Sequence, residues 1–377
     1  MSVVDVIIVN WNSRDDTLAC LAAVTAQARA LDATVTVVDN GSTDGSIAAV
    51  KQRFPDARLL PLGKNHGFTG GLAAALQRSP GRNAVFLNND AIPEEGWLAT
   101  MVAAIEGAPD DVVSVGGKIV DPSGTRVDFI GGVMTFDGHA FQNAFRFPLA
   151  SADEPNAGDD LFFACGGNMI SRRAALMELG AFDDDYFAYL EDVDFGWRTW
   201  ISGKRAVYEP RAVVRHKSSA TSNRLGDFER GVLFERNALQ TVLKNAENLR
   251  ELGGAAIFAF LHRLHHYATR RNKDAAELMR APMTKPPRRP KATIDDPLTA
   301  MQFRALEWIF ANEPRIAAKR AAVQKTRKRS DAEIFARFPL HVVPTYPGDD
   351  ALMASSLLRE MLPEWTVAKS IDEIMRR

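Results

Sequence analysis

The chain has 377 residues, of which 46% are hydrophobic and 25% are charged, and its formal net charge is −1. This composition suits one large domain with a smaller appendage, and the balanced charge gives no indication of nucleic-acid binding. Cys20 and Cys165 are far apart and form no CxxC pair, which argues against a disulfide framework and a zinc knuckle.

No signal peptide or transmembrane segment is expected. Met1 leads into an apolar run at residues 3–9 without a basic stretch before it, unlike a secretory leader. The longest apolar stretch, residues 253–261, is much shorter than the roughly 20 residues that cross a bilayer. We therefore expect a cytoplasmic protein that contacts a membrane only at its inner surface.

The first half of the chain alternates short β-rich runs with helical patterns. Strands are expected at residues 3–9, 34–38, 58–61 and 84–87, and helices at 15–30, 45–53, 70–77 and 95–106. This alternation predicts an α/β fold with a mostly parallel central sheet covered on both faces. Ligands of such sheets bind past the carboxyl ends of the strands, where Asn10, Asp39 and residues 88–90 fall.

The second half adds a C-terminal helical extension. Helices are expected at residues 191–200, 228–245 and 254–271, and a strand at 206–216. Three prolines within residues 286–290, beside basic residues, indicate a linker. We divide the chain into an α/β domain (1–224), a helical extension that packs on the core or the membrane (225–275), a Pro-rich basic linker (276–296) and a helical tail (297–377).

Two loops follow predicted strands and precede predicted helices. Residues 39–45 read DNGSTDG, and residues 65–71 read NHGFTGG. The carboxylate of Asp39 can reach a base or ribose hydroxyl, and the glycines allow a diphosphate to approach the helix N-terminus. Taken singly, an Asx turn with a helix cap explains the first loop, and a flexible turn explains the second.

Carboxylates form two further candidate sites. Asn88-Asn-Asp90 ends a strand, a position that suits Mg²⁺ or Mn²⁺ because these ions take few protein carboxylates and fill their shells with phosphates and water. Residues 191–194 read EDVD, and a general base needs such a carboxylate near the reacting hydroxyl. The alternatives are a hydrogen-bonded turn at Asp90 and an acidic first helical turn at 191–194. His216 is a ligand candidate only beside a metal carboxylate.

Together these motifs resemble those of the family 2 glycosyltransferases, which have the GT-A fold. The resemblance covers roughly residues 1–245, from VNWN at 9–12 through LEDVDFGW at 190–197 to HKSSAT at 216–221. The GFTGG and HKSSAT stretches are similar to the bacterial rhamnosyl- and galactofuranosyltransferase branch. Carried over by position, the resemblance implies nucleoside binding by Asp39, metal binding by Asp90 and His216, and base catalysis by Asp192. The family usually offers more carboxylate than Asn88-Asn-Asp90, so modest metal affinity is expected.

The remaining site residues are expected in supporting positions. Donor binding is assigned, beside Asp39, to Asn10, Asn12, Asn65, Gly67, Phe68, Gly70, Gly71 and Asn89. Support of the acceptor or of the loop is assigned to Glu191, Asp194 and Trp197.

The resemblance implies an inverting, metal-assisted transfer of a sugar from a nucleoside diphosphate to a hydroxyl of a glycan or lipid-linked glycan, in the synthesis of bacterial cell-surface polysaccharide. On branch resemblance, dTDP-rhamnose is the first expected donor and a UDP-sugar the second. One alternative is a non-catalytic nucleotide-sugar-binding protein on the same fold. A nicotinamide dehydrogenase is the other, but VNWN stands after the first strand in place of GxGxxG.

An amphipathic helix is expected at residues 254–271. At 100° per residue, Ile257, Phe260, Leu261, Leu264 and Tyr267 share one face. Packing of this face on the catalytic domain is favoured, with the seam of a homo-oligomer as a variant of packing. The functional alternative is contact with anionic lipid, helped by Arg263, Arg270 and Arg271.

Overall fold

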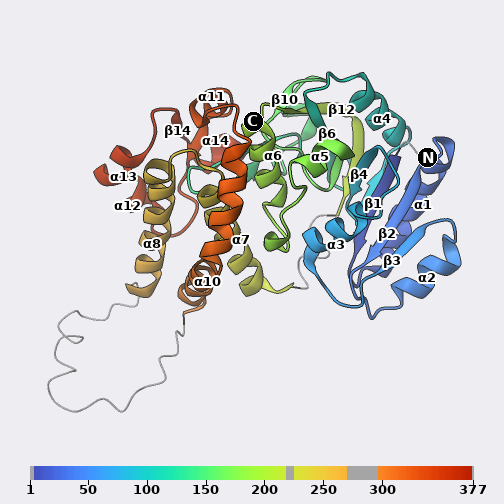
Figure 1. Ribbon diagram of the computed structural model, residues 1–377, viewed down its shortest axis with the longest axis horizontal. Coiled ribbons are helices and arrows are strands. Elements are labelled where there is room, and N and C mark those ends of the chain that lie inside the picture. Colours follow the sequence, from blue (N-terminus) through green and yellow to red (C-terminus); the bar gives the residue numbers. More distant parts are fainter. Residues whose placement is uncertain (1–3, 218–224, 270–295, 376–377) are drawn as a thin grey trace, which may run out of the picture.

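The computed structural model describes residues 4–217, 225–269 and 296–375. A ten-stranded sheet carries helices on both faces, and the C-terminal helices pack beside it (Figure 1). This arrangement confirms the predicted α/β class with its C-terminal helices. Of the predicted linker, residues 276–295 lie outside the described residues.

The N-terminal half of the sheet follows the predicted alternation. Its parallel strands are β1 (Val4–Asn10), β2 (Thr34–Asp39), β3 (Arg58–Pro61) and β4 (Asn83–Leu87). Its helices are α1 (Arg14–Ala30), α2 (Ser46–Arg53), α3 (Gly67–Leu76) and α4 (Trp97–Gly107). The third helix begins at Gly67, earlier than the expected residue 70, so the glycine-rich loop forms its first turn.

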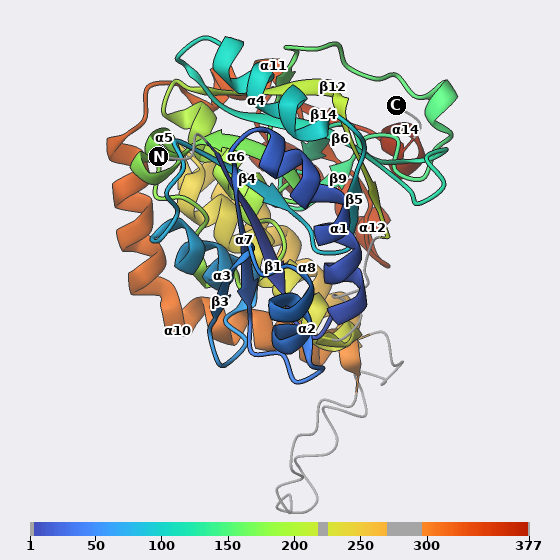
Figure 2. The same cartoon turned by 90° about the vertical axis from the view of Figure 1, so that its right-hand side faces the viewer.

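Both faces of β1 are buried, which explains its uninterrupted apolar run. Val4, Val6 and Ile8 belong to one core cluster, shared with α1 and α4, whereas Ile7 belongs to a second cluster shared with α3. Successive side chains of a strand point to opposite faces. Figure 2 shows β1 between α1 and α2 on one side and α3 on the other.

The second half of the sheet is mixed. The strand order is β10-β12-β6-β11-β4-β1-β2-β3, and β11 joins the two halves because it runs antiparallel to both β4 and β6. These strands are β5 (Ala91–Pro93), β6 (Val112–Val120), β7 (Val127–Phe129), β10 (Asp160–Leu161), β11 (Asn168–Arg172) and β12 (Arg205–His216). A separate hairpin is formed by β8 (Gly132–Met134) and β9 (Ala140–Gln142), and the helices are α5 (Arg173–Glu178) and α6 (Glu191–Ile201).

The C-terminal helices share the main hydrophobic core with the sheet, through residues such as Leu239, Ile309 and Phe335. They are α7 (Asp227–Asn245), α8 (Gly254–Thr269), α10 (Pro297–Lys325), α11 (Asp331–Arg337), α12 (Asp349–Met353), α13 (Ser356–Met361) and α14 (Ile371–Met375). The tail also contains two short parallel strands, β13 (Leu340–Val342) and β14 (Thr366–Ala368), which the sequence analysis did not predict. Three residues are too few to show an alternating pattern.

The face that α8 buries differs from the expected one. Phe260 and Tyr267 are buried, but Ile257 and Leu261 are 41% and 45% exposed. Arg263, expected to meet lipid, is buried and forms ion pairs with Asp349 at 2.9 Å and Asp137 at 2.6 Å. The expectation for Arg263 was therefore wrong, because its two partners are remote in sequence. Among the described residues, no helix is long and apolar enough to span a bilayer.

Candidate active site

A cavity of about 620 Å³ lies past the carboxyl ends of β1, β2 and β4, as expected for an α/β sheet. Its polar lining comes from residues after β1 to β4, from β7 and β12, and from the start of α6. These residues are Asn40, Asn65, Asn88, Asn89, Asp90, Asp128, Glu191, Asp192 and His216. Its aromatic lining includes Trp11, Phe68, Phe141, Phe163, Tyr189 and Phe234. The cavity therefore combines charged groups with apolar walls.

Asp90 and His216 meet in the cavity lining. The Nε2 atom of His216 lies 3.0 Å from Asp90 Oδ1, and its Nδ1 atom lies 2.7 Å from Asp128 Oδ2. Burial alone would lower the pKa of His216, but the two carboxylates outweigh it and raise the pKa to about 10. Asn88 Nδ2 lies 3.2 Å from His216 Nε2. Asp128 was missed from sequence because it stands in β7 with no motif around it.

Glu191 and Asp192 open α6 and face the same cavity. Asp192 Oδ2 accepts a hydrogen bond from the backbone N–H of Gly166 at 3.2 Å. Burial raises the pKa of Asp192, and burial together with the charge of Asp192 raises the pKa of Glu191 to about 8. Two buried carboxyl groups side by side titrate as a pair, and a raised pKa suits a proton acceptor that works near neutral pH.

The loop before α3 lines the cavity through Asn65, Gly67 and Phe68. Asn65 Oδ1 accepts hydrogen bonds from Gly67 N at 2.8 Å and from Asn40 Nδ2 at 3.0 Å. Gly67 has a φ of +76°, and a Cβ there would lie 2.4 Å from the carbonyl oxygen of Phe187. The N-terminus of α3 thus faces the cavity, as anion binding requires. Asn40 was not among the predicted site residues.

Five predicted donor-binding residues do not line the cavity. Asn10 is buried, and its amide bonds Asp39 Oδ1 at 3.1 Å. Asp39 also accepts from Ser42 N at 3.0 Å, and Asn12 Oδ1 accepts from Thr43 N at 2.7 Å. These three residues fix the turn after β2. The other two are Gly70 and Gly71, where a Cβ would lie 2.7 Å from His66 Cβ and 2.8 Å from Val9 Cγ1.

Asn89 lines the cavity, but its Nδ2 atom donates to Asn10 Oδ1 at 3.3 Å and to Thr17 Oγ1 at 3.2 Å. These hydrogen bonds hold the loop after β4 against Asn10 and Thr17. Contact of Asn89 with the donor stays a prediction.

Two expected support residues lie in the core instead. Asp194 is fully buried and pairs with Arg198 at 2.9 Å and Lys244 at 2.8 Å, which joins α6 to α7. Trp197 is fully buried, and its indole N–H lies 3.3 Å from Asp331 Oδ1. Asp194 and Trp197 thus support the α6 scaffold, and neither lines the cavity; support of an acceptor by these residues stays a prediction.

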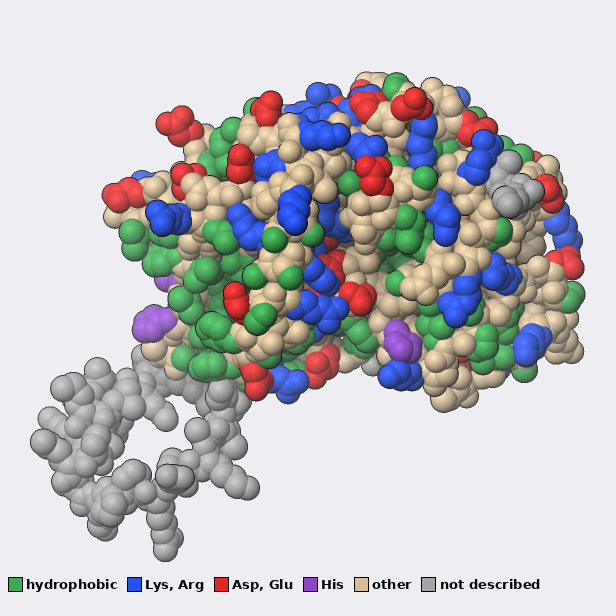
Figure 3. Space-filling model, viewed as in Figure 1, with side chains coloured by type: hydrophobic (Ala, Val, Ile, Leu, Met, Phe, Trp, Pro, Cys, Tyr) green, Lys and Arg blue, Asp and Glu red, His purple; other side chains and the backbone are tan. Residues whose placement is uncertain are grey.

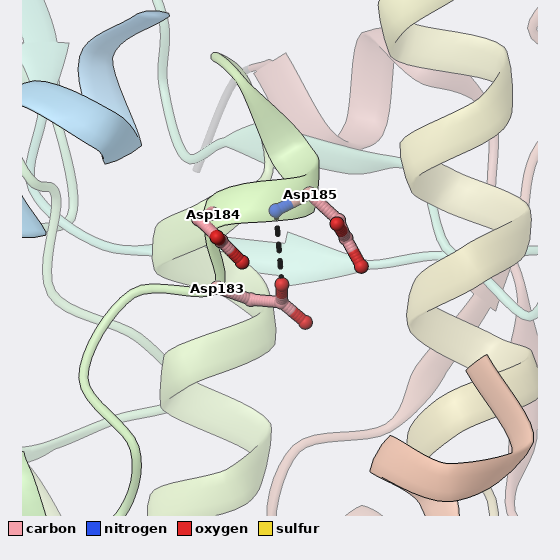
Figure 4. Close-up of side chains that lie close together, drawn as sticks. All are labelled: Asp183, Asp184 and Asp185. Carbon is pink, nitrogen blue, oxygen red and sulfur yellow. Dashed lines mark hydrogen bonds between the residues drawn. The ribbon is translucent and has the colours of Figure 1, made fainter. Parts of the chain in front are cut away.

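A second acidic cluster consists of Asp183, Asp184 and Asp185, whose carboxylates gather at one turn (Figure 4). Their spacing would suit a cation, but cationic side chains are already present. Lys244 lies 2.5 Å from Asp183, Lys319 pairs with all three carboxylates, and Arg315 lies 2.6 Å from Asp185. These pairs join α7 and α10 to the turn before α6.

The α/β sheet and a cavity past its strand ends, lined by Asp90, Asp128, His216, Glu191 and Asp192, are the arrangement expected of a glycosyltransferase with the GT-A fold. Residues 5–180 match the model of glycosyl transferase family 2. The chain therefore contains a family 2 glycosyltransferase domain over these residues.

Curated relatives agree with this assignment. The N-acetylglucosaminyl-diphospho-decaprenol L-rhamnosyltransferase of Mycobacterium tuberculosis is 28% identical over 215 residues, which cover 50% of this chain and 67% of that protein. The O-antigen biosynthesis protein RfbC of Myxococcus xanthus is 28% identical over 225 residues, which cover 57% of this chain and 17% of that protein. The chain thus resembles rhamnosyltransferase and O-antigen enzymes. These relatives disfavour the non-catalytic alternative.

Among solved structures, the crystal structure of GalNAc-T7 with UDP, GalNAc and Mn²⁺ has a TM-score of 0.52 at 14% identity. The match covers 73% of this chain and 52% of that chain. At this identity the likeness supports the GT-A fold alone.

Proposed function

We propose that this protein is an inverting, metal-assisted glycosyltransferase that uses Asp192 as its general base. One observation carries the proposal: Asp192 lines the same cavity as the Asp90–His216 pair and the N-terminus of α3. A proton acceptor, a candidate cation site and a candidate anion site therefore share one space, as transfer from a nucleoside diphosphate sugar requires.

Asp90 and His216 fit a divalent cation such as Mg²⁺ or Mn²⁺. The hydrogen bond between His216 Nδ1 and Asp128 leaves Nε2 directed at Asp90, and a carboxylate behind a histidine is the usual partner of a metal-ligating imidazole. Two protein ligands suit an ion that completes its shell with phosphate oxygens and water. When bound, the cation supplies charge neutralisation for the departing diphosphate.

The donor would lie between the α3 N-terminus and the Asp90–His216 pair. The positive end of the α3 dipole, at Gly67 and Phe68, favours a diphosphate there. Asp192 would take the proton from the acceptor hydroxyl while that oxygen attacks the anomeric carbon on the face opposite the departing nucleoside diphosphate. One direct displacement inverts the anomeric configuration and needs no covalent intermediate. Among donors, dTDP-rhamnose is proposed first, on the similarity to the mycobacterial rhamnosyltransferase, and UDP-sugars second.

The same relative's name supports a lipid-linked glycan as the acceptor. Such an acceptor would require the protein to work at the inner face of the membrane. Four large apolar side chains are exposed on α8 and α10: Ile257, Leu261, Phe303 and Phe310. Hydrophobic side chains gather over these two helices in Figure 3. We propose this patch, rather than Arg263, as the membrane-facing surface; burial of the same patch between two copies of the chain is the alternative.

A thermal-shift panel tests the donor. We expect dTDP-rhamnose, or failing that a UDP-sugar, to raise the melting temperature in the presence of Mn²⁺, because a selective ligand stabilises the native state by mass action. Stabilisation by a GDP- or ADP-sugar, with no effect of either pyrimidine donor, would overturn the donor assignment. Release of the nucleoside diphosphate by the same protein then tests catalysis.

A further inference from the structure

The backbone that leads into Glu191 and Asp192 is unusual. Phe187, Tyr189 and Leu190 have φ angles of 63°, 73° and 63°, a left-handed region that non-glycine residues rarely adopt. All three residues line the cavity. Such conformations persist only where surrounding groups hold them, and they concentrate at functional sites.

One side chain of α7 supplies much of that restraint. Asn237 Nδ2 lies 3.0 Å from the carbonyl oxygen of Tyr186 and 2.9 Å from those of Ala188 and Tyr189. Asn237 is fully buried. Its Oδ1 atom accepts a hydrogen bond from Arg236 Nε at 3.1 Å, so the donor end of the amide is directed at the loop. A buried amide in this position satisfies carbonyls that would otherwise be costly to leave without partners.

The same segment reaches the donor side of the cavity. The carbonyl oxygen of Phe187 accepts a hydrogen bond from Thr69 N, in the first turn of α3, at 3.2 Å. Arg236 Nη2 donates to the carbonyl oxygen of Asp185 at 2.8 Å. Residues 185–190 therefore connect the N-terminus of α3 to the N-terminus of α6.

We propose that Asn237 is a positioning residue that holds residues 186–190 and thereby directs Asp192 into the cavity. Leu190 is the residue immediately before α6, so the direction of the first helical turn follows from this segment. Asn237 does not line the cavity, so it would affect the reaction through the segment that it holds, and above all through Asp192. The expected loss of turnover rests on the proposed function. The expected loosening of residues 186–190 rests only on the backbone geometry.

Two variants test the inference. Asn237→Asp keeps the shape of the side chain but removes its N–H donors, and Asn237→Ala removes them without adding charge. Gln240→Ala is the matched control, because Gln240 is also a fully buried amide on α7, and among the described residues its side chain forms no hydrogen bond to the loop or to α6.

Three readouts are compared in the full chain: hydrogen exchange of amides 186–194 and Thr69, binding of UDP with Mn²⁺ by calorimetry, and release of dTDP from dTDP-rhamnose. We expect both Asn237 variants to exchange faster at these amides and to lose turnover by about 10²-fold, because small misplacement of a catalytic group has effects of that size. Nucleotide affinity should fall much less than turnover, since Asn237 does not contact the Asp90–His216 pair. The control should keep wild-type exchange at the loop and wild-type turnover.

Unchanged exchange in both Asn237 variants would overturn the inference, as would faster exchange with wild-type turnover. If the Asp variant does not fold, the Ala variant provides the same comparison. If the wild-type protein releases no dTDP from dTDP-rhamnose, the proposed donor and function are in question. The exchange data would still decide whether Asn237 holds the loop.

Discussion

Asp128 and His216 are separated by 88 positions in the chain, yet their side chains meet at 2.7 Å. Asp128 stands in β7, which pairs with β6, and His216 ends β12, which pairs with the same strand. The sheet thus brings a carboxylate behind the imidazole and leaves Nε2 directed at Asp90, 3.0 Å away. Orientation of the imidazole is the role we assign to Asp128.

We therefore expect Asp128→Asn to weaken the binding of Mn²⁺ by about 10–100-fold, the usual effect of losing a group that orients a metal-ligating histidine. Asp90→Ala should abolish metal-dependent transfer, and so should EDTA. A Mn²⁺ titration followed by calorimetry measures the affinity. Full activity in EDTA would contradict the metal assignment, and wild-type Mn²⁺ affinity in Asp128→Asn would contradict the orienting role.

The Glu191–Asp192 pair predicts the form of the pH–rate profile. Burial raises the pKa of both groups, and that of Glu191 reaches about 8. Turnover should fall as acid protonates Asp192. Ionisation of Glu191 near pH 8 adds a negative charge beside Asp192 and makes it a stronger base, so a second rise in turnover is expected there. Glu191→Gln should remove this upper step. Superimposable profiles of the two proteins, measured between pH 5 and 9, would show that the pair is not coupled to the reaction.

Lys244 should contribute strongly to the stability of the fold. It is 2% exposed and lies 2.5 Å from Asp183 and 2.8 Å from Asp194, and its charge helps to hold the pKa of both carboxyl groups below the usual range. Lys244→Met would leave two buried carboxylates with less compensation, at a cost of about 3–5 kcal/mol. Urea unfolding measures this cost. A loss below about 1 kcal/mol would indicate that Lys319 and Arg198 compensate on their own.

The apolar patch on α8 and α10 predicts binding to anionic vesicles. Phe310 is 70% exposed, and Ile257 and Leu261 are 41% and 45% exposed. The triple variant Ile257→Ser, Leu261→Ser and Phe310→Ser should pellet less with anionic liposomes than the wild-type chain does. Met177→Ser is the control, since Met177 is 42% exposed on α5, outside the patch. Equal pelleting of all three proteins, or none by the wild type, would remove the membrane assignment.

Much of the α/β domain could be predicted from local patterns. Apolar strands buried on both faces and the helices between them leave periodic signals, and the turns that follow β1, β2 and β4 were expected beside a ligand. The sequence could not distinguish the side chains that hold the loops in shape from those that line the cavity. Asn10 and Gly71 both lie in motifs that were expected to bind the donor. In the structure, Asn10 hydrogen-bonds Asp39, and Gly71 leaves room for the side chain of Val9.

Other parts of the site depend on contacts between remote segments. Asp128 and Asn237 have no local signature, because β-strand pairing and the docking of α7 bring them into place. The buried pairing of Arg263 with Asp137 and Asp349 is of the same kind. A helical-periodicity argument places Arg263 on a face but does not reveal a carboxylate that lies 86 positions away.

The most direct test of the proposed mechanism is the turnover of Asp192→Asn. This change keeps the shape of the side chain and removes its ability to accept a proton. We expect donor binding to stay at the wild-type level and turnover to fall by about 10²–10⁴-fold, the usual cost of losing a general base. Turnover near that of the wild-type protein would contradict the assignment and move the role of base to another group, with Glu191 as the first candidate.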